Sequence, residues 1–368
     1  MTGAPARVAI FTSTMGGGGA QRSMLRLAGA IADRGYGVDL VLARAEGHYR
    51  DEVSEAVRVV GLGGRRALLS VPHLVRYLRR ERPAAMLSSL DYVNIVGLWA
   101  RRLAGVSTRM VVNEQNTLSI AVKNSSRWRT RMMPRLIHRF YPWADGIVAV
   151  SRGVADDLAQ VAGLRRETIR VIHNPVVTAR LKAMAAEPVE HPWFGPGEPP
   201  VVVALGRLVP QKDFSALIQA FAGVRRVRPA RLLILGEGPE RRRLESLAAT
   251  CGVERDVQLP GWIVNPYPYL MRSRLFVLSS RWEGLPTVLI EALFCGLSVV
   301  STDCPSGPRE ILEGGKHGLL VPVGGTEALR AAMERALGGD APRPSRESWA
   351  PFEEASVVGQ YLGALFGA

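Results

Sequence analysis

The chain has 368 residues, of which 47% are hydrophobic, and a formal net charge of +14 at pH 7. This length predicts about two domains with enough apolar residues to fill their cores. The three cysteines are scattered and match neither a disulfide framework nor a metal-ligand spacing, which indicates a reducing compartment. No apolar run approaches the roughly 18 residues of a spanning helix, and residues 1–6 do not open a secretory leader, so we expect a soluble or peripheral protein.

The excess of positive charge suggests an anionic partner. An anionic membrane surface, a nucleic acid and a phosphate-bearing substrate are all compatible with it. An arginine-rich composition from a GC-rich genome explains part of the excess without any partner. The net charge alone therefore does not identify the partner.

The first half of the chain alternates predicted strands and helices. The expected strands are 8–12, 38–42, 57–60, 86–90, 110–113, 146–150 and 169–172, and the expected helices are 20–34, 71–80, 93–104, 127–141 and 154–162. Such alternation predicts a parallel sheet covered on both faces. Ligands of these sheets lie at the carboxyl ends of the strands, and residues 113–116, with the sequence Asn-Glu-Gln-Asn, follow one such strand.

A glycine run at residues 16–19 separates the first predicted strand from the first predicted helix. Glycines let backbone N–H groups approach a ligand closely, and the start of a helix favours an anion. A glycine run more often marks a plain turn, so this observation on its own is weak.

Residues 119–141 form a basic amphipathic stretch with six cations and no carboxylate. Apolar residues recur at every fourth position from Trp128 to Phe140, which is typical of a helix that lies on an anionic membrane. The alternative is a solvated basic face whose apolar side packs on the protein core. The cations are Lys123, Arg127, Arg129, Arg131, Arg135 and Arg139.

The composition changes at residues 183–200, where prolines at 188, 192, 196, 199 and 200 predict a linker. A second α/β pattern follows, with expected strands at 201–205, 232–235, 257–259, 275–278 and 299–302. After the first of these strands, Arg207 and Lys212 stand on either side of a loop before a helix that starts near Phe214. Two cations in this position suit a diphosphate, although a surface turn remains the alternative.

The most informative stretch is residues 279–292, with the sequence SSRWEGLPTVLIEA. An apolar strand precedes it, and a helix from Thr287 that ends near Gly296 follows it. The start of such a helix is an anion site, and the carboxylates of Glu283 and Glu291 accept hydrogen bonds from hydroxyls. Together they suit a sugar nucleotide, while a capping glutamate and a glutamate on a solvated face are the alternative.

This stretch resembles the signature of the retaining glycosyltransferases of family 4, in which a Glu is followed seven residues later by a second Glu. The resemblance extends over about residues 7–340 and implies a GT-B fold, that is, two Rossmann-like doubly wound α/β domains facing each other across a cleft. The implied domains are an acceptor-side domain at 1–182, the linker at 183–200, a donor domain at 201–350, and a helix at 351–368 that crosses back to the first domain.

The resemblance also implies roles for individual residues. Glu283 is expected to bind the hydroxyls of the donor sugar, Glu291 the ribose, and Arg207 with Lys212 the leaving diphosphate without a metal. The glycine loop is expected to face the donor phosphate. The full expected donor set is Gly18, Gly19, Arg207, Lys212, Trp262, Glu283, Gly284, Leu285, Pro286, Thr287 and Glu291.

Two positions depart from the family pattern. Gln21 replaces the usual Glu of the glycine loop, and Gln115 stands where many members carry a His near the reacting carbon. A Gln cannot act as a general base, but it still donates and accepts hydrogen bonds. Gln115 is therefore kept in the expected catalytic set with Glu283, Arg207 and Lys212, and Glu114 is the nearby carboxylate to test as its substitute.

We expect a retaining glycosyltransferase that uses a nucleotide sugar as co-substrate, UDP-sugar being favoured, and needs no further cofactor or metal. Family members that extend polyprenyl-diphosphate-linked glycans have a similar cationic helix, so the expected acceptor is a lipid-linked glycan. The expected location is cytoplasmic and peripheral, on an anionic membrane, with no nucleic acid partner. Expected acceptor or membrane contacts come from Glu114, Lys123, Arg127, Arg131 and Arg135.

Three alternatives remain. The first is a transferase that acts on a soluble acceptor such as a natural product. The second, a sugar-nucleotide epimerase of the same fold, fits less well because its signature differs. The third is a non-catalytic basic module that binds membrane or nucleic acid. Gln115 supports this alternative, and the presence of Arg207, Lys212, Glu283 and Glu291 argues against it.

Overall fold

The computed structural model describes residues 6–16, 18–47, 49–64 and 67–367. Residues 1–5 and Gly17, on which part of the expectations for the leader and the glycine loop fall, lie outside this range. The chain divides into two compact units, which are described separately. Unit 1 comprises Met1–Pro175 and Phe352–Ala368, and unit 2 comprises Val176–Pro351.

Within the described residues, unit 1 is built on a seven-stranded sheet in the order β3-β2-β1-β4-β5-β6-β7, and every pairing is parallel. Its inner strands consist mostly of buried residues, as expected where helices cover both faces, whereas the edge strands β3 and β7 are largely not buried. The strands are β1 (Arg7–Thr12), β2 (Gly37–Leu42), β3 (Val57–Gly61), β4 (Ala85–Ser89), β5 (Arg109–Glu114), β6 (Gly146–Ala149) and β7 (Ile169–Val171).

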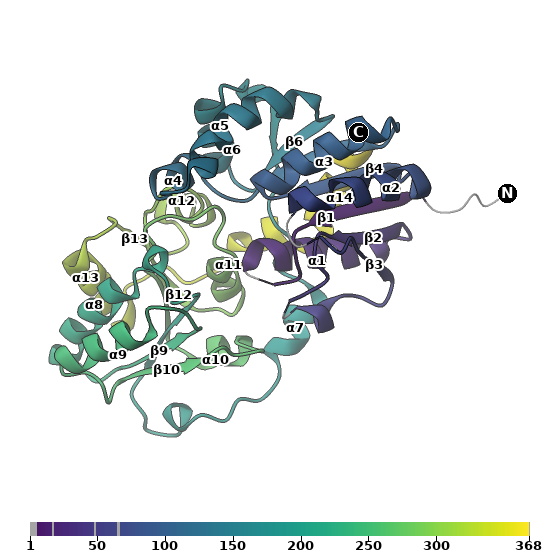
Figure 1. Cartoon of the computed structure of the whole chain (residues 1–368). Helices are drawn as coiled ribbons and strands as arrows, with labels where there is room; N and C mark the ends of the chain where they lie inside the picture. Colours follow the sequence, from purple (N-terminus) through teal and green to yellow (C-terminus); the bar gives the residue numbers. More distant parts are fainter. Residues whose placement is uncertain (1–5, 17, 48, 65–66, 368) are drawn as a thin grey trace. The chain divides into compact units, whose positions relative to one another are not determined.

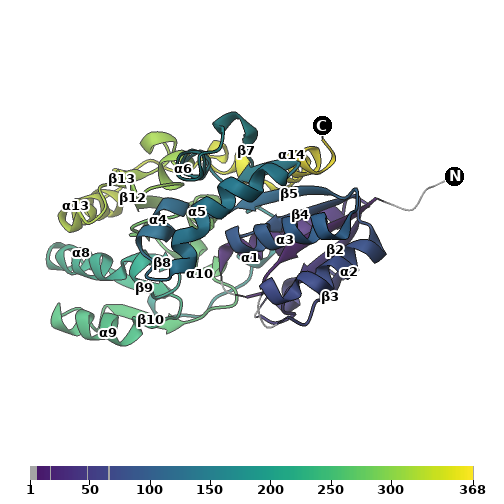
Figure 2. The ribbon, with the colours of Figure 1, turned by 45° about the horizontal axis from the view of Figure 1, so that its top comes forward.

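Helices cover both faces of this sheet. Helices α1 and α14 pack together on one face, while α2, α3 and α5 follow one another along the other (Figures 1 and 2). The helices are α1 (Gly19–Ala32), α2 (Val71–Glu81), α3 (Asp91–Ala104), α4 (Leu118–Lys123), α5 (Trp128–Phe140), α6 (Arg152–Ala162) and α14 (Glu354–Phe366), with short 3₁₀ turns η1 (Arg50–Glu52), η2 (Ala67–Ser70), η3 (Tyr141–Trp143) and η4 (Arg166–Thr168).

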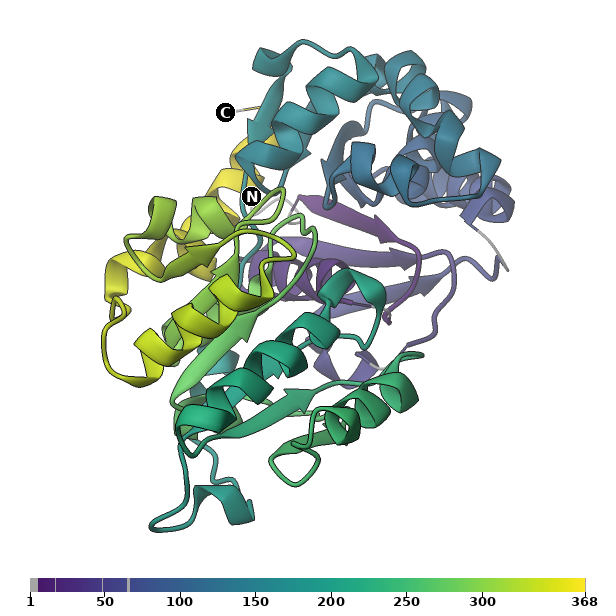
Figure 3. The ribbon, with the colours of Figure 1, turned by 90° about the vertical axis from the view of Figure 1, so that its left-hand side faces the viewer.

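Unit 2 has a six-stranded parallel sheet in the order β10-β9-β8-β11-β12-β13 over the residues that the structure describes. Figure 3 shows α8, α9 and α13 in front of this sheet, and Figure 1 shows α10 and α11 on its other side. The strands are β8 (Val201–Leu205), β9 (Arg231–Leu235), β10 (Val257–Gly261), β11 (Leu275–Leu278), β12 (Ser298–Thr302) and β13 (Leu319–Val321).

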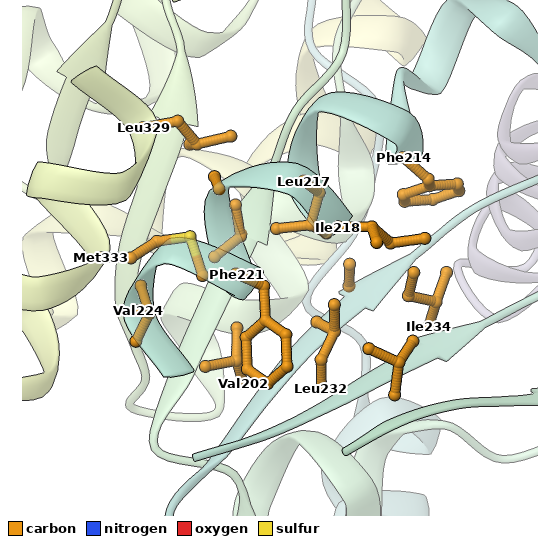
Figure 4. Packing of buried hydrophobic residues seen from close by; sticks show 14 of the residues in the cluster. Val202, Phe214, Leu217, Ile218, Phe221, Val224, Leu232, Ile234, Leu329 and Met333 are labelled. Carbon is orange, nitrogen blue, oxygen red and sulfur yellow. The ribbon is translucent and has the colours of Figure 1, made fainter. Parts of the chain in front are cut away.

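Helices α8, α9 and α13 pack on one face of this sheet through one apolar cluster. The cluster includes Phe214, Leu217 and Phe221 of α8, Leu232 of β9 and Met333 of α13 (Figure 4). The helices are α7 (Ala179–Ala185), α8 (Phe214–Val227), α9 (Arg241–Thr250), α10 (Tyr267–Arg272), α11 (Thr287–Phe294), α12 (Pro308–Ile311) and α13 (Thr326–Leu337), with 3₁₀ turns η5 (Pro192–Phe194), η6 (Pro210–Lys212), η7 (Glu313–Gly315), η8 (Arg346–Ser348) and η9 (Ala350–Phe352).

The predicted α/β class with two parallel sheets is confirmed. The expected border at residue 182 and the expected linker at 183–200 fall within unit 2, because α7 packs on α10. The expected C-terminal helix is α14, which contacts α1, β4 and β5 of unit 1. Helices α4, α7, α10, α12 and α13 were not predicted, since most of them are short.

Candidate functional site

The strand order of unit 2 creates a switch point between β8 and β11. Strand β8 pairs with β9 on one side and with β11 on the other, so the connections leave the sheet in opposite directions. In open parallel sheets ligands bind at the carboxyl ends of the strands next to such a point. The loops that begin there are residues 206–213 after β8 and residues 279–286 after β11.

An ion pair joins the two loops. Nζ of Lys212 donates to Oε1 of Glu283 at 2.5 Å, and Oγ of Ser280 donates to the same oxygen at 2.6 Å. Oγ of Ser279 in turn donates to the carbonyl of Lys212 at 2.7 Å. The side chains of Lys212 and Glu283 are only 17% and 9% exposed, so solvent weakens their attraction less than that of a surface pair. The loop after β11 therefore presents a fixed carboxylate next to a fixed cation.

Further contacts hold the two loops in register. Nε of Arg281 donates to Oδ2 of Asp213 at 2.8 Å, and Nε2 of Gln211 donates to the carbonyl of Trp282 at 2.9 Å. Asp213 has a left-handed backbone with φ 46°, an uncommon conformation for a non-glycine residue. A buried Asp in this conformation, paired with Arg281, turns the chain into α8 directly after Lys212.

Glycines allow the loops after β8 and β9 to touch. A Cβ on Gly236 would lie 1.9 Å from the carbonyl oxygen of Gly206, and a Cβ on Gly238 would lie 2.4 Å from that of Leu208. The stem of Lys212 passes over Gly206, with its Cε 3.2 Å from an ideal Cβ there. Arg207 is exposed beside these contacts. The predicted cations thus flank a closely packed backbone, and Arg207 is the one open to solvent.

Glu291 lies in the second turn of α11 and is buried. The hydroxyl of Tyr267 in α10 donates to its Oε1 at 3.2 Å. Helix α11 starts at Thr287, directly after Pro286, and its apolar residues lie in the core of unit 2. Gly307 packs against this start, since a Cβ on it would lie 2.4 Å from Cδ of Pro286.

The remaining members of the expected donor set lie at two other places. Gly284, Leu285 and Pro286 are buried in the loop that leads into α11, while Trp262 follows β10 and is exposed. Gly18 and Gly19 belong to unit 1, where α1 begins at Gly19. Within unit 2 the structure therefore brings Lys212 and Glu283 into contact. It leaves Arg207 exposed after β8 and Trp262 exposed after β10, with β9 between these two strands.

In unit 1, Gln115 follows β5 and is buried in a pair of amides. Its Nε2 donates to Oδ1 of Asn174 at 3.3 Å, and Nδ2 of Asn174 donates back to its Oε1 at 2.8 Å. Asn174 lies next to Pro175, the residue at which unit 1 ends before Val176. The side chain at the position of the family's usual His is thus oriented by the segment that leaves unit 1.

Glu114 is buried one residue earlier. The hydroxyl of Tyr141 and Nδ2 of Asn94, at 3.2 Å, both donate to its Oε1. Burial, assisted by the negative charge of Asp91, raises the pKa of Glu114 to about 8, although the two hydrogen bonds act in the opposite direction. Glu114 is therefore largely a neutral acid near pH 7, held within the core of unit 1.

Helix α5 buries one of its two adjacent rows of apolar residues. Met133 and Ile137 are in the core, and Tyr141 directly after the helix is also buried, whereas Trp128 is exposed. The guanidinium of Arg129 lies 5.6 Å from the ring of Trp128. The expected membrane cations Lys123, Arg127, Arg131 and Arg135 are all exposed. The apolar side of α5 is thus partly core and partly surface.

Several residues of these sites were missed from the sequence. Ser280 and Tyr267 contact the predicted carboxylates of unit 2, Asp213 pairs with Arg281 beside them, and Asn174 orients Gln115. Asn174 opens an Asn-Pro-Val run at residues 174–176, whereas the other three residues stand in no pattern that indicates these contacts. Among the described residues, no three His, Cys, Asp or Glu side chains gather in a way that suits a metal ion.

Comparisons with known families and proteins agree along the whole chain. The profile of the family described as "Glycosyltransferase Family 4" matches residues 17–180, and that of "Glycosyl transferases group 1" matches residues 190–352. The lipopolysaccharide core biosynthesis glycosyltransferase LpsE of Rhizobium meliloti is 30% identical over 348 residues, which cover 94% of this chain and 92% of LpsE.

A second relative comes from Campylobacter jejuni and is named N-acetylgalactosamine-N,N'-diacetylbacillosaminyl-diphospho-undecaprenol 4-alpha-N-acetylgalactosaminyltransferase. It is 29% identical over 283 residues, covering 76% of this chain and 75% of the relative. Among solved structures, Anabaena HepE in complex with UDP and glucose superposes with a TM-score of 0.79 at 20% identity, covering 99% of this chain and 100% of HepE. At this identity the similarity demonstrates the fold.

Proposed function

The chain belongs to the family 4 glycosyltransferases and has their GT-B fold, and from this we propose that it moves a sugar, with retention of configuration and without a metal, from a nucleoside diphosphate to a lipid-linked glycan. The observation that carries the proposal is the contact between Lys212 and Glu283 at the switch point of unit 2. One group there binds hydroxyls and the other binds phosphate, which are the two halves of a sugar nucleotide.

In the proposed mechanism, the acceptor hydroxyl oxygen bonds to the anomeric carbon while the bond from that carbon to the diphosphate breaks. The acceptor's proton passes to an oxygen of the leaving diphosphate on the same face. Lys212 and Arg207 stabilise the negative charge that develops on this diphosphate, the step at which fixed cations lower the barrier most. Because the leaving group takes the proton, a Gln in place of the family's His is compatible with turnover.

Glu283 is proposed to accept hydrogen bonds from the sugar hydroxyls and Glu291 from the ribose. Ser280 donates to Glu283 and Tyr267 donates to Glu291, so both carboxylates are held in position before the donor arrives. Donor phosphate then competes with Glu283 for Lys212. UDP is the favoured nucleotide because HepE, which has the same fold, was crystallised with UDP and glucose.

The proposed acceptor is a glycan built on a membrane lipid. Two relatives are named for work on lipopolysaccharide core and on a diphospho-undecaprenol-linked glycan. No helix of the described residues is long and apolar enough to span a bilayer, whereas the exposed cations of α4 and α5 suit an anionic lipid surface. We therefore propose peripheral binding to the membrane through α5.

The donor half is tested with a panel of UDP-, GDP- and dTDP-sugars, scored by thermal shift and by slow donor hydrolysis. Glu283→Gln keeps the size of the side chain and removes its charge, and Glu245→Gln on the exposed side of α9 is the control. We expect one nucleotide to raise the melting temperature, and hydrolysis to fall about 100-fold or more in the Glu283 variant only. Equal hydrolysis in both variants would reject the proposed donor site.

The membrane half is tested by sedimentation with vesicles that contain anionic lipid. Charge reversal of Arg127, Arg131 and Arg135 is expected to lower partition by about 100-fold or more, since each cation contributes on the order of 1 kcal/mol. Reversal of three exposed arginines of unit 2, Arg226, Arg242 and Arg343, changes the net charge equally and serves as the control. If both triple variants lose partition equally, binding through α5 is rejected. A soluble acceptor or a non-specific effect of net charge would then explain the result.

A further inference from the structure

The excess positive charge of the chain is concentrated in one part of unit 1. Residues 62–80 and 92–141 together contain 14 Lys and Arg residues and a single carboxylate, Glu114, while the whole chain has a net charge of +14. Glu114 is buried, so it does not offset these cations at the surface. A general arginine bias would spread the excess along the whole chain. Its confinement to two segments indicates a surface that meets an extended anionic partner.

These two segments are neighbours in space. Helix α2 contacts α3, α3 contacts α5, and the short turn η2 contacts both α2 and α3. Figure 2 shows α5, α3 and α2 in a row along one side of the unit 1 sheet. We call this layer, from η2 to α5, the basic layer. Arg65 and Arg66, directly before η2 in the sequence, lie outside the described residues, and the basic layer is defined without them.

One edge of the basic layer also exposes apolar side chains. Leu68 and Leu69 in η2 are 58% and 59% exposed, and Trp128 in the first turn of α5 is 70% exposed. Turn η2 and the first turn of α3 follow strands β3 and β4, so both lie at the carboxyl edge of the sheet. The last turn of α5 leads into β6 and therefore lies near the amino edge of the sheet. The first turn of α5, at the other end of the helix, then lies toward the carboxyl edge.

We propose that Leu68 and Leu69 form an apolar wedge that inserts into an anionic bilayer, with Trp128 as a second point of insertion at the same edge, while the cations of the basic layer bind the lipid phosphates. The inference deepens the proposed function and depends on its membrane-bound acceptor. Apolar side chains beside cations are the pattern of interfacial membrane binding. A nucleic acid would use the cations but gain little from two adjacent exposed leucines. The wedge lies at the carboxyl edge of the sheet, the edge that also carries Gln115.

The wedge contributes an affinity for the membrane that added salt does not weaken. Attraction between cations and lipid phosphates weakens as salt screens it, whereas burial of leucine in the bilayer does not. Burying a leucine side chain fully changes a binding constant by about tenfold or more. Two leucines at one point therefore set how much protein stays bound at high salt, and the cations set how binding depends on salt.

The test is vesicle sedimentation at about 0.1 and 0.5 M KCl, with about 30% phosphatidylglycerol in phosphatidylcholine. The variant is Leu68→Ser with Leu69→Ser. The control is Leu103→Ser, because Leu103 is 60% exposed in the last turn of α3, at the opposite end of the same layer. We expect the double variant to bind at least about tenfold more weakly at both salt concentrations, and Leu103→Ser to bind like the wild type.

A second variant, Leu68→Trp with Leu69→Trp, is expected to shift partition in the opposite direction, since tryptophan prefers the membrane interface. Wild-type partition of both double variants would overturn the wedge, as would a leucine-independent preference for a DNA duplex over vesicles. Donor hydrolysis separates this inference from the proposed function. It should be unchanged in both double variants; if the wild type shows no hydrolysis while partition still follows the leucines, the proposed function fails and the wedge stands.

Discussion

Lys212 and Glu283 are 71 residues apart in the chain, yet Nζ of Lys212 lies 2.5 Å from Oε1 of Glu283. Parallel pairing of β8 with β11 brings their loops together. The hydroxyl of Ser280 donates a second hydrogen bond to the same oxygen of Glu283. A donor phosphate has to compete with this pair for Lys212. The ion pair thus keeps the cation close to the place where diphosphate charge is proposed to develop.

Lys212→Met tests this relationship, because methionine keeps most of the apolar stem that passes over Gly206 and removes the charge. We expect donor hydrolysis to fall about 100- to 1,000-fold, the usual effect of losing one fixed group that stabilises developing charge. Ser280→Ala is the matched control, because it removes a hydrogen bond to Glu283 but leaves both charges; its expected loss is about tenfold. A Lys212→Met enzyme as active as wild type would show that the cation has no part in the reaction.

Gly307 and Gly324 allow a matched test of how the start of α11 is shaped. Both have positive φ, of 95° and 76°, a range that L side chains rarely adopt, so alanine strains the backbone at each. Only at Gly307 does a Cβ collide, at 2.4 Å from Cδ of Pro286, while nothing lies within 4 Å at Gly324.

We therefore expect Gly307→Ala to lower both the melting temperature and the affinity for the donor nucleotide. Gly324→Ala should lower the melting temperature slightly and leave nucleotide affinity unchanged. Thermal unfolding and calorimetric titration with the nucleotide found in the donor panel measure the two effects. Equal nucleotide affinity in both variants would mean that the contact with Pro286 does not shape the donor site.

The strands were predictable because central parallel strands are continuous apolar runs, such as Val201–Leu205, that few other structures use. The signature around Glu283 predicted its loop through the family resemblance. The partners of that loop were not predictable. Asp213 acts through a left-handed backbone, and Ser280 acts through a hydrogen bond between neighbouring turns. Neither property leaves a periodic pattern in the sequence.

Helix α5 shows the limit of periodicity in another way. Its apolar residues form two adjacent rows, one through Met132 and one through Met133, and periodicity favours both equally. The neighbours α3 and α6 decide that the row of Met133 and Ile137 enters the core. Glu114 was similarly ambiguous, since only the fold reveals that Tyr141 and Asn94 enclose it.

The ionised carboxylate of Asp39 in β2 contributes to the free energy of unfolding, and this contribution is lost in acid. Burial alone would raise its pKa, but hydrogen bonds from Arg58 and Tyr77 and the charges of Arg58 and Arg7 outweigh burial and hold the pKa below the usual 3.8. A depressed pKa in the folded state means that the stabilisation is present above about pH 4 and is lost as pH falls through the folded pKa.

Asp39→Asn should therefore lower the free energy of unfolding at pH 7 by about 1–3 kcal/mol, because Arg58 and Tyr77 lose a charged acceptor. The difference from wild type should shrink as pH falls below about 4. Urea unfolding between pH 3 and 7 measures it, with the exposed Asp33→Asn as control. A difference that stays constant with pH would contradict the depressed pKa.

The titration of Glu114 should change stability with pH in the opposite direction to that of Asp39. The pKa of Glu114 is about 8 in the folded protein, against the usual 4.5 of an exposed glutamate. Between these values the unfolded chain has released the proton and the folded chain has kept it, so stability falls as pH rises from about 4.5 to 8. The slope expected for one proton is about 1.4 kcal/mol per pH unit.

Glu114→Gln removes this titration and mimics the neutral acid, with an oxygen that still accepts from Tyr141 and Asn94. The variant should match the wild type near pH 5 and exceed its free energy of unfolding at pH 8. The exposed Glu55→Gln should follow the wild type at every pH. Denaturant unfolding across this range decides the matter: if Glu114→Gln and wild type lose stability in parallel from pH 5 to 8, then Glu114 is ionised in the folded protein, and a carboxylate beside Gln115 becomes available as a base for the acceptor hydroxyl.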